Sequence, residues 1–196
     1  MTIDLFISCV MDQFYPDTAK NVVKVLNAAD VDLEYNPEQT CCGKFAFNSG
    51  FVDEAKELGE KFLRDFPNDR PIVGVSASCV GYIKKRYEEL FYNTASHLEY
   101  KRLVRNIFEF TDFLVNKINI LNFGAEFNHK VVYQDTCCSL RELGLKDEGR
   151  KLLSNVKGIE ILEMKYPEVC CGFGGGFFSI QHEAISVAMA ERKIKD

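Results

Sequence analysis

The sequence lacks long hydrophobic runs and any excess of positive charge. No apolar segment approaches the roughly 20 residues that a membrane-spanning helix needs. The first residues, Met1-Thr2-Ile3-Asp4, carry no basic group of the kind that opens a secretory signal. Lysine and arginine total 24 against 29 aspartates and glutamates, a formal net charge of −5, whereas a nucleic-acid surface needs clustered basic residues. We therefore expect a cytoplasmic protein with no membrane span and no nucleic-acid partner.

Histidine is scarce, and the usual catalytic constellations are missing. Only three histidines occur, His97, His129 and His182, and none has helical i, i+4 spacing to another. No Ser-His-Asp or Cys-His-Asn set stands at a persuasive spacing. The glycine-rich stretch at 172–176 lacks the Gly-Lys-Ser/Thr ending of a phosphate-binding loop. These patterns identify no catalytic residue.

Cysteine, by contrast, is abundant. The eight cysteines are Cys9, Cys41, Cys42, Cys79, Cys137, Cys138, Cys170 and Cys171. Six of them form three adjacent pairs, and adjacent cysteines rarely bridge each other because the ring strains the disulfide geometry. With 196 residues, 46% of them hydrophobic, the chain can fold without disulfides. Metal binding or redox chemistry is therefore favoured, with a disulfide scaffold or structural thiols as the alternative.

The sequence contains an internal repeat built around the cysteines. The tripeptide Cys-Cys-Gly occurs at 41–43 and again at 170–172, 129 positions later. Another cysteine precedes each copy by a similar interval, Cys9 by 32 positions and Cys137 by 33. Cys79 follows the first copy, and the same offset places its counterpart at position 208, past the last residue of the sequence. The repeat predicts a duplicated unit whose second copy is C-terminally incomplete.

Hydrophobic periodicity predicts strands that alternate with helices. The predicted strands are 3–8, 31–35, 72–76, 130–134 and 159–163. The predicted helices are 17–29, 53–66, 80–91, 101–119, 145–155 and 181–193. This alternation indicates an α/β protein of two similar Rossmann-like lobes with parallel sheets, in a pseudo-twofold arrangement. The expected divisions are a first cysteine-rich lobe at 1–100, a linking helix and loop at 101–128, and a truncated second cysteine-rich lobe at 129–196.

The cysteines follow predicted strands in both lobes. Ligands of parallel α/β sheets bind beyond the carboxyl ends of the strands, so the cysteines of each lobe are expected to converge there. The first lobe contributes Cys9, Cys41, Cys42 and Cys79, and the second contributes Cys137, Cys138, Cys170 and Cys171. Lys44, a cation beside Cys42, would stabilise thiolates, although an ordinary surface lysine is the alternative.

Thiolates bind both zinc and iron–sulfur clusters. Zinc sites usually contain cysteines two to four residues apart, yet no Cys-x-x-Cys occurs here. Adjacent cysteines chelate one tetrahedral ion awkwardly, whereas a cluster of several irons lets neighbouring thiolates reach different irons. The spacing favours an iron–sulfur cluster, with zinc as the alternative.

The cysteine motifs together resemble a known family. The segments that carry the resemblance are Phe6-Ile-Ser-Cys-Val, Gln39-Thr-Cys-Cys-Gly, Phe47-Asn-Ser-Gly, Ser76-Ala-Ser-Cys, Thr136-Cys, Leu140-Arg-Glu-Leu-Gly and Cys170-Cys-Gly-Phe-Gly-Gly. They resemble the cysteine-rich domain that is found in heterodisulfide reductases and in the iron–sulfur subunits of glycolate oxidase and anaerobic glycerol-3-phosphate dehydrogenase. The sequence is most similar to the lactate utilization protein A family of iron–sulfur oxidoreductases.

The resemblance implies an iron–sulfur electron-transfer subunit, with clusters of 4Fe–4S type, in a complex that oxidises L-lactate to pyruvate beside lactate utilization B and C type proteins. It assigns Cys9, Cys41, Cys42 and Cys79 to one cluster, and Cys137, Cys170 and Cys171 to a second set. Two positions depart from the patterns: Tyr82 stands where heterodisulfide reductases complete a Cys-x-x-Cys, and Cys138 stands where lactate utilization proteins commonly have histidine. A heterodisulfide-reductase-like thiol/disulfide redox subunit and a zinc-binding structural protein are the alternative functions.

Overall fold

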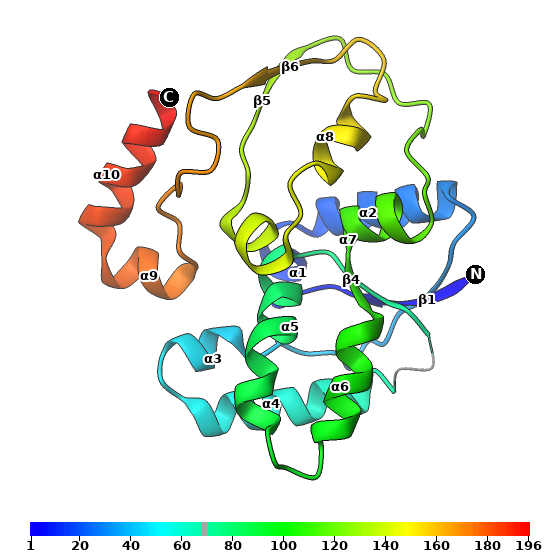
Figure 1. Ribbon diagram of the computed structural model, residues 1–196, viewed down its shortest axis with the longest axis vertical. Coiled ribbons are helices and arrows are strands. Elements are labelled where there is room, and N and C mark those ends of the chain that lie inside the picture. Colours follow the sequence, from blue (N-terminus) through cyan, green and yellow to red (C-terminus); the bar gives the residue numbers. More distant parts are fainter. Residues whose placement is uncertain (68–69) are drawn as a thin grey trace.

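A computed structural model describes residues 1–67 and 70–196 (Figure 1). Its first half contains β1 (Thr2–Phe6), α1 (Cys9–Phe14), α2 (Pro16–Ala28), β2 (Asp32–Glu34), α3 (Lys44–Asn48), α4 (Val52–Asp65), β3 (Ile72–Gly74), α5 (Ala77–Phe91), α6 (His97–Asn106), β4 (Ile107–Glu109), α7 (Phe110–Asp112) and the π-helical η1 (Phe113–Lys117). Its second half contains β5 (Lys130–Tyr133), the π-helical η2 (Cys138–Leu143), α8 (Glu148–Leu153), β6 (Glu160–Glu163), α9 (Gly176–Gln181) and α10 (Glu183–Ile194). No described helix combines the length and apolar character needed to cross a bilayer.

The first half is built on a parallel sheet with strand order β2-β1-β3-β4. β1 pairs with β2 on one side and with β3 on the other, and β4 extends the sheet beyond β3. Ile3, Leu5 and Phe6 of β1 are fully buried, as expected for a central strand that is covered by helices on both faces. The prediction of an α/β fold with parallel sheets is confirmed.

Helices cover both faces of this sheet (Figure 1). On one face, α4, α5 and α6 enclose a core rich in aromatic rings, in which Phe6 meets Phe62 edge-on with ring centroids 4.9 Å apart. On the other face, α2 and η1 bury Val22, Leu26 and Phe113 against the strands. Burying one such side chain stabilises the fold by roughly 1.5–3 kcal/mol. Cys42 belongs to this aromatic core and Cys79 packs against it, so the core supports the segments that contain these two cysteines.

The second half repeats the element order of the first. β5 and β6 form a parallel pair in which Lys130 lies opposite Glu160, and α8 connects them. A second Cys-Cys-Gly loop then leads into α9 and α10, as the first leads into α3 and α4. This order agrees with a duplicated unit. The pseudo-twofold relation and the lobe boundaries stay predictions.

The predicted helix over 101–119 is wrong as a single element. α6 ends at Asn106, and the chain then forms β4, whose Ile107 lies opposite Ile72 of β3. Ile107 is fully buried in this pairing, and the β-branched side chain suits a strand. Glu109 then caps the next helical segment, because its carboxylate accepts hydrogen bonds from the backbone N–H groups of Thr111 and Asp112. Burial at the sheet edge therefore outweighs the helical periodicity.

Candidate functional site

The four cysteines of the first half lie together beyond the carboxyl ends of the strands; we call this group the first site. Cys9 opens α1 directly after β1, and Cys79 lies in the first turn of α5 after β3. Cys41 and Cys42 lie in the loop between β2 and α3. Neighbouring thiols interact in the order Cys9, Cys41, Cys42, Cys79, since each affects the pKa of the next. The structure thus brings together four residues that are up to 70 positions apart in the sequence.

Burial increases along this row of thiols. Cys9 is exposed, whereas Cys41 and Cys79 are half-buried. Cys42 is only 1% exposed and forms part of the aromatic core. Tyr87 fixes its backbone, because the buried tyrosine hydroxyl donates a 2.9 Å hydrogen bond to the Cys42 carbonyl oxygen. The first site therefore has one end in the core and one edge at the surface.

The thiols differ in their proton affinities. Hydrogen bonds from Cys42 and Cys9, together with backbone N–H groups, lower the pKa of Cys41 to about 2. The hydrogen bond with Cys42 also lowers the pKa of Cys79, and a cysteine in the first turn of a helix favours the thiolate. Hydrogen bonds to neighbouring thiols and burial raise the pKa of Cys42 and of Cys9. The four thiols therefore interact strongly with one another, and binding of a metal requires that the ligating thiols lose their protons.

Gly43 gives the first Cys-Cys-Gly loop its shape. Its φ of +87° lies in the left-handed region, and a Cβ atom at this position would lie 3.0 Å from the Ala55 carbonyl oxygen. The resulting turn points the Gly43 N–H at the Cys41 sulfur, 3.4 Å away. The glycine therefore orients a backbone donor toward a thiolate and lets α4 pack closely against the loop.

Replacing Gly43 with alanine is expected to destabilise the protein more than replacing Gly50. Both residues have φ near +85°, so each alanine costs about 1–2 kcal/mol of left-handed strain. Only at Gly43 does the new methyl group also press on a backbone atom, since nothing lies within 4 Å of the position at Gly50. Urea denaturation of both variants measures the difference. Equal losses of stability would contradict this account of the loop.

Gln39 holds the same loop against the end of β1. Its side-chain oxygen accepts a 2.8 Å hydrogen bond from the Ile7 N–H, and its side-chain nitrogen donates to the carbonyl oxygens of Leu5 and Asn36. The segment before Cys41 is thereby fixed to the strand that leads to Cys9. The sequence analysis included Gln39 in a motif but assigned it no role, because its partners are identified only by the fold.

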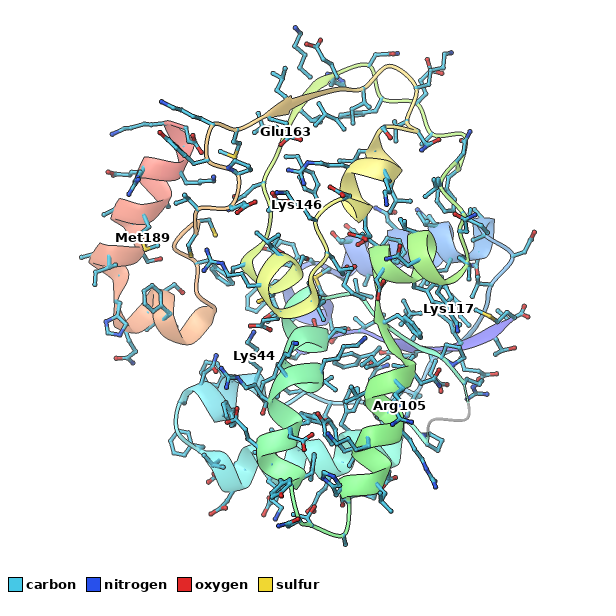
Figure 2. All side chains as sticks on the ribbon, viewed as in Figure 1. Lys44, Arg105, Lys117, Lys146, Glu163 and Met189 are labelled. Carbon is cyan, nitrogen blue, oxygen red and sulfur yellow. The ribbon has the colours of Figure 1, made fainter. Side chains whose placement is uncertain are left out.

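Lys44 links the first site to the second half (Figure 2). Its ammonium donates to the Ser78 carbonyl and hydroxyl oxygens, at 3.2 and 3.0 Å, and to the Cys138 sulfur at 3.6 Å. The Glu142 carboxylate lies 3.9 Å away. Burial raises the pKa of Cys138, and the charge of Lys44 opposes this shift. The Lys44 ammonium therefore lies between Ser78, which is the neighbour of Cys79, and Cys138 of the second half.

The cysteines of the second half are arranged differently. The loop at 170–172 repeats the first loop closely, since the Gly172 N–H donates to the Cys170 sulfur at 3.4 Å and Gly172 has a φ of +89°. Cys137 is exposed, and Cys171 is half-buried. Within the described part of the chain, no hydrogen bond joins Cys137 or Cys138 to the 170–172 loop. The structure thus gathers the first four predicted cysteines, whereas the described residues show no corresponding interaction between Cys137 or Cys138 and the 170–172 loop.

The fold and the repeated loops define a class of protein. The family model described as CCG, cysteine-rich domain, matches residues 3–84 and 131–196. These two segments contain both Cys-Cys-Gly loops and the cysteines that precede them. The class is that of proteins with two cysteine-rich segments, in which the cysteines are expected to bind a metal or a cluster.

Curated relatives narrow this class. Lactate utilization protein A 2 of Bacillus cereus is 38% identical over 196 residues, which span all of this chain and 81% of that protein. Lactate utilization protein A 1 of Bacillus anthracis is 37% identical over the same span. Lactate utilization protein A of Oceanobacillus iheyensis is 38% identical over 194 residues, which span 98% of this chain and 79% of that protein. The chain belongs to this lactate utilization protein A family.

Proposed function

We propose that the chain is an iron–sulfur electron-transfer subunit of a complex that oxidises L-lactate to pyruvate. The observation that carries this proposal is the row of four mutually interacting thiols at the carboxyl ends of the strands. The names of the relatives support lactate as the substrate of the complex. When bound, the cluster supplies a carrier for single electrons.

The donor set fits an iron–sulfur cluster. Four thiols are the usual ligand complement of one cluster, and the first site offers four. Among the described residues, no three histidine, cysteine or carboxylate side chains are arranged around the position of a single ion. Thiols placed in a row, with two of them adjacent in sequence, suit a centre whose ligand points are spread over several metal atoms. We infer that Cys9, Cys41, Cys42 and Cys79 hold a cluster of 4Fe–4S type.

The surrounding residues stabilise negative charge at the first site. The N–H groups of Gly43 and Phe45 point at Cys41, and the hydroxyl groups of Ser76 and Ser8 lie beside Cys79. Donors to sulfur favour the reduced form of a cluster and so raise its reduction potential. The positive charge of the Lys44 ammonium also favours the reduced form and so raises the reduction potential.

The surface edge beside Cys9 offers a route for electrons to a partner. Cys9 is exposed, and Val10 and Phe14 of the same helix also expose apolar side chains. We propose that lactate utilization B and C type proteins are the partners of the complex. Cys137, Cys138, Cys170 and Cys171 are proposed as ligands of a second centre.

The function is tested by turnover with the companion proteins. The chain is reconstituted anaerobically with iron and sulfide, combined with B and C type proteins, and supplied with either L-lactate or a disulfide substrate. The expected result is pyruvate formation that requires the reconstituted chain. Turnover of the disulfide without turnover of lactate would favour the heterodisulfide-reductase-like alternative.

A further inference from the structure

Tyr82 is a buried tyrosine whose hydroxyl has no hydrogen-bond partner among the described residues. It lies one helical turn after Cys79 in α5, and residues three apart share a helix face. Its side chain is 1% exposed. No described residue makes a hydrogen bond with its hydroxyl oxygen, which is shielded from solvent. Buried tyrosine hydroxyls almost always find a partner, because an unmade hydrogen bond costs free energy.

The neighbouring Tyr87 shows that a buried tyrosine in this core can find a hydrogen-bond partner. The unpaired hydroxyl is therefore specific to the position of Tyr82. The rings of Tyr82 and Tyr87 meet edge-on with centroids 5.5 Å apart, but the Tyr87 hydroxyl donates to the Cys42 carbonyl oxygen. Phe47 packs against the Tyr82 ring at 5.5 Å and offers no acceptor. In the part of the chain that the structure describes, one of these two adjacent buried phenols therefore has a hydrogen-bond partner and the other has none.

The unpartnered hydroxyl lies close to the first site. Tyr82 lies in the same buried cluster as Cys42, and Cys79 packs against that cluster. Burial raises the pKa of Tyr82, and the charges of Cys42 and Cys41 raise it further. A phenol keeps its proton at neutral pH, so the hydroxyl can donate a hydrogen bond to a sulfur atom of this site or to a group bound there. A cluster brings sulfur acceptors that the protein alone does not place beside this hydroxyl.

We propose that Tyr82 is a positioning residue of the first site, whose hydroxyl donates a hydrogen bond to a sulfur atom of the bound iron–sulfur centre. This inference rests on the proposed function. It assigns a role to a residue that stands where the heterodisulfide reductase pattern has a cysteine. The Tyr82 hydroxyl then has a hydrogen-bond partner only in the loaded protein, that is, when the iron–sulfur centre is bound.

The proposal predicts effects of Tyr82→Phe that differ between the two states. Phenylalanine keeps the ring packing and removes only the hydroxyl. In the metal-free protein the variant is expected to be at least as stable as the wild type, because it removes an unpaired buried group. In the loaded protein it is expected to lower the reduction potential, because the reduced centre loses a donor. We expect about a tenfold change in the reduction equilibrium, which is ~59 mV for one electron.

The experiment compares the wild-type chain with Tyr82→Phe and with Tyr87→Phe. Urea denaturation gives the stability of the metal-free proteins, and anaerobic redox titration followed by electron paramagnetic resonance gives the potential of the reconstituted ones. Tyr87→Phe is the matched control, since it loses a hydrogen bond within the protein and is expected to destabilise the metal-free state. A lower potential for Tyr82→Phe, without loss of metal-free stability, supports the proposal.

Three results would overturn the role proposed for Tyr82. Only one of them would also overturn the proposed function. An unchanged potential at normal iron content removes the role of Tyr82 and leaves the proposed function standing. Destabilisation of metal-free Tyr82→Phe to the extent seen for Tyr87→Phe shows that the hydroxyl has a partner within the protein. Failure of the wild type to take up iron and sulfide removes both the role of Tyr82 and the proposed function.

Discussion

Replacing Cys42 with serine is expected to remove most of the iron that the first site binds, while the α/β fold stays intact. Cys42 is the buried member of the row, and its sulfur contacts both Cys41 and Cys79. A serine hydroxyl is a harder donor that binds iron less well than a thiolate. Its burial costs about 1–3 kcal/mol if it lacks a partner, which is a modest cost for a core of this size. Iron and sulfide content after anaerobic reconstitution, together with far-UV circular dichroism, measures both effects.

The repeated motif provides the matched control. Cys171 occupies the equivalent place in the second Cys-Cys-Gly loop but is half-buried and outside the first site. Cys171→Ser is therefore expected to leave the iron of the first site unchanged. Unchanged iron content in Cys42→Ser would remove this cysteine from the proposed ligands.

Replacing Arg150 with methionine is expected to destabilise the second half by about 3 kcal/mol. Arg150 in α8 donates paired hydrogen bonds to Asp135, at 2.6 and 3.1 Å, and to Glu163, at 2.7 and 2.9 Å. It also lies over the Tyr133 ring, 4.5 Å from the centroid. Asp135 follows β5 and Glu163 ends β6, so the arginine joins the carboxyl ends of the two strands.

The expected loss follows from the burial of Asp135. Its side chain is 2% exposed, and that of Arg150 is 20% exposed. Removing one partner of a buried ion pair leaves the other charge unpaired, and this typically costs about 3–5 kcal/mol. The partial exposure of Arg150 places the effect near the lower end of that range. Methionine keeps much of the apolar stem, so lost packing contributes little.

Lys146→Met is the control for Arg150→Met. Lys146 pairs with Glu168 at 2.7 Å in the same half of the molecule, but both side chains are more than half exposed. Exposed pairs of this kind contribute about 0–1 kcal/mol. Figure 2 shows Lys146 and Glu163 in the second half. Urea denaturation and amide hydrogen exchange in β5 and β6 measure both variants, and equal losses would contradict the role given to Arg150.

The sequence predicted the larger elements of the fold because their side chains carry a clear period. Ala55, Leu58 and Phe62 lie on one face of α4, and the predicted helix at 53–66 agrees with Val52–Asp65 to within one residue. The short helices α1, α3 and α9 were not predicted, since five or six residues are too few to show a helical period. The strand at Ile107 was missed because its burial depends on β3, a partner distant in sequence.

The sequence predicted that the first four cysteines lie together, because of their positions relative to the strands. Each comes soon after a parallel strand, and the carboxyl ends of such strands meet at one edge of the sheet. The contacts around them could not be predicted in this way. Lys44 and Cys138 are 94 positions apart, and the unpartnered hydroxyl of Tyr82 depends on what the fold fails to place beside it. Such features appear only when distant segments are packed together.

The central claim is that Cys9, Cys41, Cys42 and Cys79 hold an iron–sulfur cluster. The most direct test is anaerobic reconstitution of the wild-type chain, followed by quantitation of iron, sulfide and zinc and by electron paramagnetic resonance of the reduced protein. The account predicts bound iron and acid-labile sulfide, with a paramagnetic signal that Cys42→Ser abolishes in the first site. One zinc ion per chain, with no iron, no sulfide and no signal, would contradict it.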